Sequence, residues 1–122
     1  MVIDSNNKLI DCPSLDEFTR QAEALLETDS AEVWISERGG QDDMPCLSIL
    51  INRHEYVINY FGADGCNYAS IGNENDDRSV SFCNGQYIIA GYQVIPKDAA
   101  LTILLDFFRT LKPSEAIRWE EL

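Results

Sequence analysis

The sequence predicts an α+β domain in which a single antiparallel sheet of about six strands packs against an N-terminal and a C-terminal helix. Three observations support this prediction. Two apolar runs, 47–51 and 56–61, flank a short polar stretch, as in a β-hairpin. A helix start precedes them, and a second helix with a broad apolar face follows near the C-terminus. With 122 residues, the chain is long enough for one domain with its own core, which we assign to 1–122.

The first helix is expected to begin after Ser14, which suits the N-cap position. Glu17 follows three residues later and completes a capping box. Apolar residues then recur at helical spacing and form one face, which we expect to pack on the sheet rather than bind a partner. These residues are Leu15, Phe18, Ala22, Leu25 and Leu26. Before the helix, Leu9 and Ile10 form either a short strand or a lead-in.

The two central runs are rich in Ile, Val, Leu and Tyr, which favour strands. Leu47, Ile49 and Ile51 share one face, but the residues between them are also largely apolar. We therefore expect this pair of strands to lie in the middle of the sheet, with cover on at least one side. The polar residues 52–55 are predicted to form a four-residue connector.

The remaining strands are predicted at 31–37, 66–71, 79–83, 86–90 and 92–95. In the first of these, Val33 and Ile35 face one side and Trp34 faces the other. Asn84-Gly85 predicts a tight turn, because both residue types tolerate positive φ. Gly91 is interpreted as a bulge between the last two strands.

The second helix is expected to begin at Pro96, with Asp98 near its positive end, and to stop at Lys112-Pro113. Its apolar face is wider than that of the first helix, so this helix should be the more buried of the two. The face contains Leu101, Leu104, Leu105, Phe108 and Leu111. In the tail, Ile117 and Trp119 lie on one side if the segment is extended.

The charge of the chain is unusual, since 9 basic residues against 21 acidic residues give a net charge of −12. Such a surface repels nucleic acid and anionic membranes and attracts basic proteins. No apolar stretch approaches the ~18 residues of a membrane-spanning helix, and no signal peptide is recognisable. We therefore expect a cytoplasmic protein that is a monomer or weak dimer when free, without membrane or direct nucleic-acid partners.

No residues form a recognisable catalytic or metal-binding motif. The four cysteines, Cys12, Cys46, Cys66 and Cys83, contain no C-x-x-C pair, and we expect them to be reduced and buried. We therefore expect no catalytic residues, no metal and no cofactor. An enzyme would have to use His54, the only histidine, with a nearby carboxylate. A ligand-binding regulatory module with a pocket under Trp34 is a second alternative.

Acidic residues gather in two predicted loops, where they favour contact with arginine and lysine of a basic partner. These candidate binding residues are Asp42, Asp43, Glu74, Asp76 and Asp77, with Glu37 nearby. Plain solubility is the competing explanation for each loop. Alternatively, Tyr87 and Tyr92 anchor a partner on a sheet face, because tyrosine is enriched at binding hot spots.

The order of motifs resembles the first-numbered immunity-protein family of bacterial polymorphic toxin systems. The matching motifs are SLDEF at 14–18, VWISERGG at 33–40, PCLSILIN at 45–52, VINYF at 57–61, VSFCNGQ at 80–86, VIPKDAALTILLDFF at 94–108 and IRWEE at 117–121. The resemblance covers nearly the whole chain, and IRWEE after the Phe-rich helix is its most specific part.

The resemblance implies a small cytosolic protein that binds and neutralises a cognate toxin domain, often a nucleic-acid-targeting one such as a deaminase. Toxins of this kind take part in contact-dependent or type VI secretion competition between bacteria. It implies no catalytic residues. It also gives the net charge of −12 a purpose, because carboxylates can occupy the basic face that such a toxin needs to hold nucleic acid.

Overall fold

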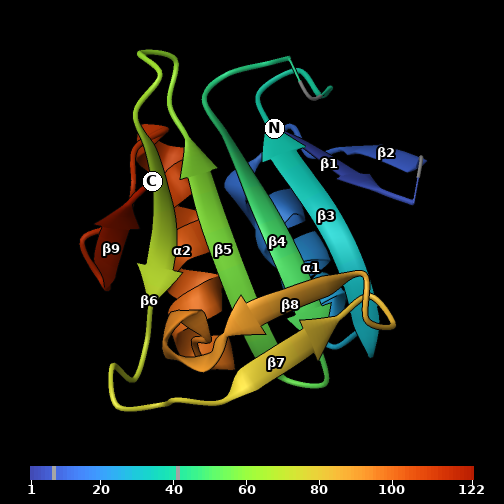
Figure 1. Ribbon diagram of the computed structural model, residues 1–122. Coiled ribbons are helices and arrows are strands. Elements are labelled where there is room, and N and C mark those ends of the chain that lie inside the picture. The colour runs from blue at the N-terminus through green and yellow to red at the C-terminus, as the bar shows by residue number, and fades with distance from the viewer. Residues whose placement is uncertain (7, 41) are drawn as a thin grey trace.

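The computed structural model describes residues 1–6, 8–40 and 42–122, and it confirms the predicted α+β class. Seven strands form one antiparallel sheet in the order β2-β1-β3-β4-β5-β6-β9, and β7 and β8 form a second, two-stranded sheet (Figure 1). The strands are β1 (Val2–Ser5), β2 (Lys8–Asp11), β3 (Ser30–Ser36), β4 (Cys46–Asn52), β5 (Glu55–Phe61), β6 (Asn67–Ile71), β7 (Ser79–Phe82), β8 (Tyr87–Ala90) and β9 (Arg118–Glu121). The helices are α1 (Leu15–Leu26), α2 (Lys97–Thr110) and the short 3₁₀ helix η1 (Gly91–Gln93).

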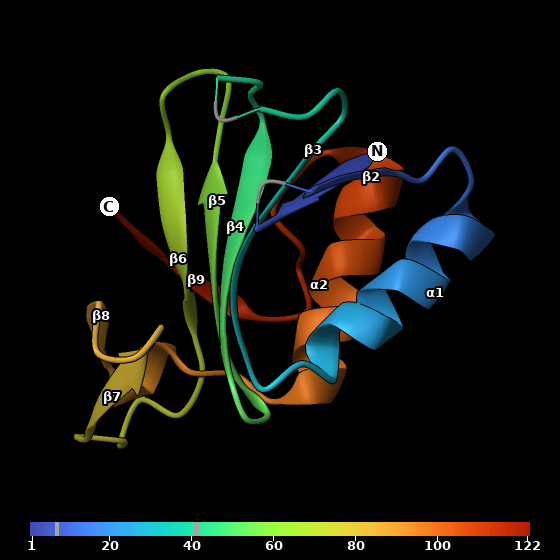
Figure 2. The ribbon, with the colours of Figure 1, turned by 90° about the vertical axis from the view of Figure 1, so that its right-hand side faces the viewer.

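Both long helices lie on one face of the seven-stranded sheet, and the β7–β8 hairpin lies against the other (Figure 2). The helix-side core follows the predicted alternation, since Leu47, Ile49 and Ile51 are fully buried there. They pair across the strands with Tyr60, Ile58 and Tyr56, which face the same side. The predicted stripe of α1 is buried apart from Leu15, which is only half-buried.

The N-cap prediction is confirmed in part. The hydroxyl oxygen of Ser14 accepts a hydrogen bond from the backbone N–H of Glu17 at 3.2 Å. The carboxylate of Glu17 pairs with Arg20, at 2.5 Å, instead of returning to the cap. One half of the capping box is thus formed, and the other half is replaced by an ion pair between successive turns of the helix.

The connector between β4 and β5 is shorter than predicted. Asn52 and Glu55 pair with each other across the strands, so only Arg53 and His54 form the turn. Both have positive φ, 46° and 69°, as in a type I′ turn. The predicted four-residue connector is therefore wrong, because polar residues can end a strand without leaving the ladder. The Asn84-Gly85 turn is confirmed, with φ of 56° and 88°.

The largest difference from prediction concerns the segment from β7 to η1. We expected its strands to extend one sheet, but β7 and β8 pair only with each other. The predicted strand 92–95 is instead η1 followed by a single bridge between Tyr56 and Ile95. Gly72 allows this path, because a Cβ there would lie 1.9 Å from the carbonyl oxygen of Val94. The strand count also rises because β1, a short and half-polar segment, was not predicted.

The β7–β8 hairpin is held on the sheet by a second, smaller core. Leu50 and Val57 point away from the helices and pack against Val80 and Phe82 of β7. The side-chain amide of Asn52 also donates a hydrogen bond to the carbonyl oxygen of Ser81, at 3.0 Å. This core covers one end of the sheet face that points away from the helices.

We expect Tyr56→Phe to lower the free energy of unfolding by about 1–3 kcal/mol. Tyr56 is fully buried, and its hydroxyl donates a hydrogen bond to the carbonyl oxygen of Leu26 at the end of α1. The substitution leaves that carbonyl without its donor. Urea unfolding measures the loss, with Tyr68→Phe, a half-buried tyrosine, as the control. Equal stability of both variants would contradict a structural role for this hydrogen bond.

Candidate functional site

The outer face of the sheet, which points away from the helices, is the candidate functional site. Strand alternation and register place on it Asp4 of β1, Glu32 and Trp34 of β3, Cys46 and Ser48 of β4, Asn59 and Phe61 of β5, Ala69 of β6 and Glu120 of β9. The β7–β8 hairpin crosses only one end of these strands (Figure 1). A rigid sheet therefore presents side chains that neither helix covers.

Two aromatic rings dominate the outer face. The rings of Trp34 and Phe61 stack at a centroid distance of 5.7 Å, although β4 runs between their strands. They can meet because their partners on β4, Ser48 and Cys46, are small and buried. Both rings remain half-buried, so each keeps surface for another molecule. Sequence reasoning placed Trp34 on this face but missed Phe61 as its partner, because their meeting depends on register.

Tyr92 of η1 and Glu120 of β9 form a polar group at the β9 edge of the sheet. The Tyr92 hydroxyl donates to the carboxylate oxygens of Glu120 at 2.7 and 3.0 Å, and the side-chain amide of Gln93 donates to the same carboxylate at 3.0 Å. The hydrogen bond to Glu120 raises the pKa of Tyr92, with burial as a second cause. Tyr92 is thus held in place by the chain itself.

Tyr87 belongs to the second core rather than to an open surface. It is half-buried against that core. A hydrogen bond to the carboxylate of Glu32, followed by burial, raises the pKa of its phenol. The structure therefore brings Tyr87 to the same face as Tyr92, but both phenols are engaged with carboxylates of their own chain.

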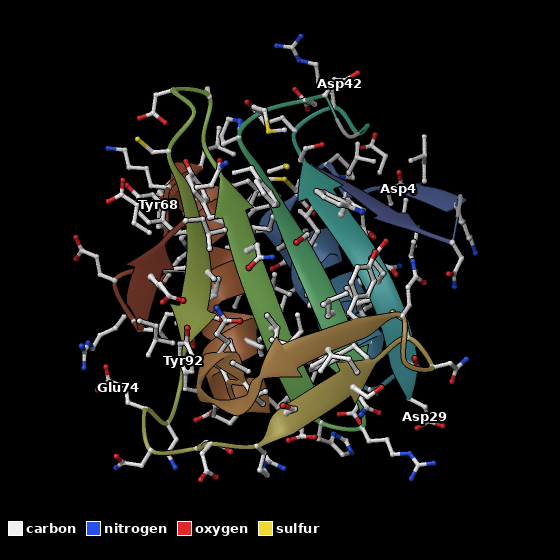
Figure 3. All side chains as sticks on the ribbon, in the orientation of Figure 1. Asp4, Asp29, Asp42, Tyr68, Glu74 and Tyr92 are labelled. Atoms are coloured by element: carbon white, nitrogen blue, oxygen red, sulfur yellow. The ribbon has the colours of Figure 1, made fainter. Side chains whose placement is uncertain are left out.

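The structure divides the predicted acidic residues between two ends of the sheet, as the labelled Asp42 and Glu74 show in Figure 3. Glu37, Asp42 and Asp43 belong to the β3–β4 connection, where a carboxylate oxygen of Asp43 accepts from the backbone N–H of Arg38 at 2.7 Å. The other three belong to the β6–β7 connection. The six residues therefore do not form one cluster.

Two acids of the β6–β7 connection are occupied by arginines of the same chain. Arg78 binds Asp76 at 2.8 Å and Glu55 at 3.0 Å, and its hydrogen bonds hold the pKa of Asp76 below its usual value. Glu74 pairs with Arg118 at 2.9 Å. Glu37, Asp42 and Asp77 are exposed, and Glu37 lies with residues at the end of α2. The acids best placed to meet a molecule on the outer face are therefore Asp42 and Asp77, one at each end of the sheet.

An apolar hollow of about 730 Å³ lies elsewhere, between the β5–β6 turn and the end of α2. It is lined by the rings of Tyr60, Tyr68 and Trp119. The Tyr60 hydroxyl donates to the carbonyl oxygen of Leu111 at 3.0 Å, and the Trp119 indole donates to that of Ser114 at 2.7 Å. With two of the three polar tips engaged in the chain, the hollow offers mainly apolar surface.

Two alternatives from the sequence, a histidine-based site and a metal site, can be compared with the structure. His54 is exposed in the β4–β5 turn. Within 1–6, 8–40 and 42–122, no three His, Cys, Asp or Glu side chains gather as metal ligands. In the same part of the chain, neither helix has the length and apolar character needed to cross a bilayer. Cys12 and Cys46 are buried, whereas Cys66 and Cys83 are half-buried, so the expected burial holds for two of four thiols.

No known protein-family model matches the sequence, and no curated protein is significantly similar to it.

We expect Glu120→Gln to lower the pKa of Tyr92, which an ultraviolet titration of tyrosinate would detect. In the folded protein, Tyr92 must ionise beside the Glu120 carboxylate, which raises its pKa. This contact therefore stabilises the fold below the ordinary tyrosine pKa of about 10 and loses its effect as the pH rises through the folded value. Glu115→Gln, at an exposed site, is the control. An unchanged titration curve would contradict the assigned contact.

Proposed function

We propose that this protein is an immunity protein that binds and neutralises a cognate bacterial toxin domain, a nucleic-acid-targeting deaminase or nuclease, by occluding its basic active-site face. The observation that carries the proposal is the outer face, where a half-buried aromatic pair shares the sheet surface with the carboxylates of Asp4, Glu32 and Glu120. The resemblance of the motif order to an immunity-protein family agrees with it. We place this interaction in the cytoplasm, where the toxin would act.

The aromatic pair suits the centre of an interface. Trp is among the residue types that contribute most to binding energy, and hot spots cluster at the centre of an interface. Trp34 and Phe61 stand on β3 and β5, which are held on the opposite face by the main core. Because the two rings already stack on each other, binding orders little that is not ordered in the free protein.

The acidic residues suit the rim of the same interface. A toxin that acts on nucleic acid needs a basic face, and a protein of net charge −12 attracts such a face over a distance. Asp42 and Asp77 flank the outer face at its two ends. The acidic loops and the sheet face, which the sequence offered as alternatives, are thus proposed as rim and centre of one binding surface.

A ligand-binding module is the second candidate function, and the apolar hollow lined by Tyr60, Tyr68 and Trp119 favours it. Its volume of about 730 Å³ falls within the range of small-molecule sites. This hollow differs from the pocket under Trp34 that the sequence suggested. The two functions are separable, because a ligand-binding module needs no affinity for a toxin domain.

We expect Trp34→Ala to weaken binding of the cognate toxin domain, to be sought among the neighbouring genes, by about 30-fold or more, a hot-spot loss of at least about 2 kcal/mol. Calorimetry measures the affinity, and circular dichroism checks the fold. Tyr68→Ala, which removes a half-buried ring on the helix side, is the matched control. Absence of binding by the unsubstituted protein would overturn the proposed function.

Neutralising the rim should slow association with the toxin domain and reduce its dependence on salt, with little effect on dissociation. The test variant combines Asp42→Asn with Asp77→Asn. A control of equal charge change combines Glu23→Gln with Glu115→Gln, which are exposed on α1 and after α2. Stopped-flow measurements across a salt series compare the two. Equal association rates would show that the acidic loops serve solubility alone.

A further inference from the structure

A second hollow opens on the outer face, between β1, β3 and the tip of the β7–β8 hairpin. We call it the hairpin hollow; it measures about 430 Å³. Its chemistry comes from six side chains: Asp4, Asn6, Glu32, Trp34, Asn84 and Gln86. Trp34 lines this hollow and also belongs to the proposed interface. The hollow lies on the β1 side of Trp34, whereas Phe61 lies on its β4 side, because β3 runs between β1 and β4.

The hairpin hollow carries negative charge that its own lining does not neutralise. Asp4 and Glu32 supply two carboxylates, and among the described residues no lysine or arginine lines the hollow. The ion pairs that the structure gives to Arg20, Arg78, Lys97, Arg109 and Arg118 all involve other acids. The side-chain amides of Asn6, Asn84 and Gln86 add further acceptor oxygens.

We propose that the hairpin hollow is a guanidinium site that receives an arginine side chain of the toxin domain; this inference rests on the proposed function. An arginine offers five N–H donors in a planar fork, which match carboxylate oxygens, and its flat face stacks on aromatic rings. Trp is the best aromatic partner for a cation. Carboxylates beside an indole therefore fit this ligand better than they fit an anion or an apolar side chain.

Contacts within the chain order parts of the hollow before any ligand arrives. The Glu32 carboxylate lies close to the Tyr87 phenol and raises its pKa. The hairpin tip is a tight turn closed by a hydrogen bond from the N–H of Gln86 to the carbonyl oxygen of Cys83, at 3.1 Å. Trp34 is held by its stacking on Phe61. A preorganised site loses little conformational entropy when a long side chain enters it.

The first test uses N-acetyl-arginine amide as the probe and N-acetyl-citrulline amide, which has the same shape without the charge, as its control. Two-dimensional NMR follows the indole N–H signals of Trp34 and Trp119. We expect the arginine probe to shift the Trp34 signal in a saturable manner, the citrulline probe to leave it unchanged, and neither probe to shift Trp119. A Trp34 signal that fails to move, or that moves equally with both probes, overturns the inference.

Variants separate the hollow from the general negative charge. Asp4→Asn combined with Glu32→Gln should weaken binding of the arginine probe at least about tenfold. Glu23→Gln with Glu115→Gln, which removes the same charge from exposed positions elsewhere, should change it less than about twofold. Because Glu32 also lies beside Tyr87, Asp4→Asn alone is measured as well and should weaken binding of the probe in the same direction. Equal effects of both double variants overturn the inference.

The same double variants distinguish this inference from the proposed function. Asp4→Asn combined with Glu32→Gln should weaken binding of the toxin domain at least about tenfold, chiefly through faster dissociation. If the toxin domain binds the unsubstituted protein and this variant equally well, the inference fails and the proposed function stands. If the arginine probe binds at Trp34 and the toxin domain does not bind at all, the proposed function fails and the guanidinium site remains.

Discussion

The fold depends on one constraint, which is that the two central strands are apolar on both faces. Leu47, Ile49 and Ile51 of β4 point to the helices, while Leu50 of β4 and Val57 of β5 point away from them. A single layer of helices can bury only one of these faces. The sheet therefore needs a second cover, and the chain supplies it as a hairpin that leaves the main sheet and packs across it. The hydrophobic effect favours burial of this second apolar face, but it does not determine how much of the face the hairpin covers.

The proposed binding surface follows from the small size of that cover. Strands β7 and β8 have four residues each, so they bury one end of the outer face and leave the rest. Beyond the cover, the outer face of β4 and β5 carries the polar residues Ser48 and Asn59. There the aromatic rings of Trp34 and Phe61 stack on each other across β4. The edge of the cover also forms one wall of the hairpin hollow. One part of this sheet face thus contributes to stability, and another part is the proposed recognition surface.

Local signals predicted the parts of the fold that local chemistry determines. Ser14 marked a helix start, alternation assigned the faces of β4 and β5, and Asn84-Gly85 located a tight turn. The separate β7–β8 sheet was not predictable in this way, because alternation identifies a strand but not the sheet that it joins. Strand β1 was missed because four mixed residues carry no pattern, and Asp4 was missed with it. The aromatic pair and the hairpin hollow depend on register across several strands, which no local pattern reveals.

The distribution of thiols has a practical consequence for studying this protein. Cys12 is buried, and burial together with Asp43 raises the pKa of the buried Cys46 to about 11, so neither offers an accessible thiolate near neutral pH. The half-buried thiols lie one at each hollow, Cys66 in the apolar hollow and Cys83 in the hairpin hollow. Burial, with a smaller effect of Glu32, raises the pKa of Cys83, so its alkylation should be slow. A molecule that covers this thiol should slow the alkylation further. Alkylation rates of Cys66 and Cys83, measured with and without a bound molecule, would therefore show which hollow the molecule occupies, without any engineered label.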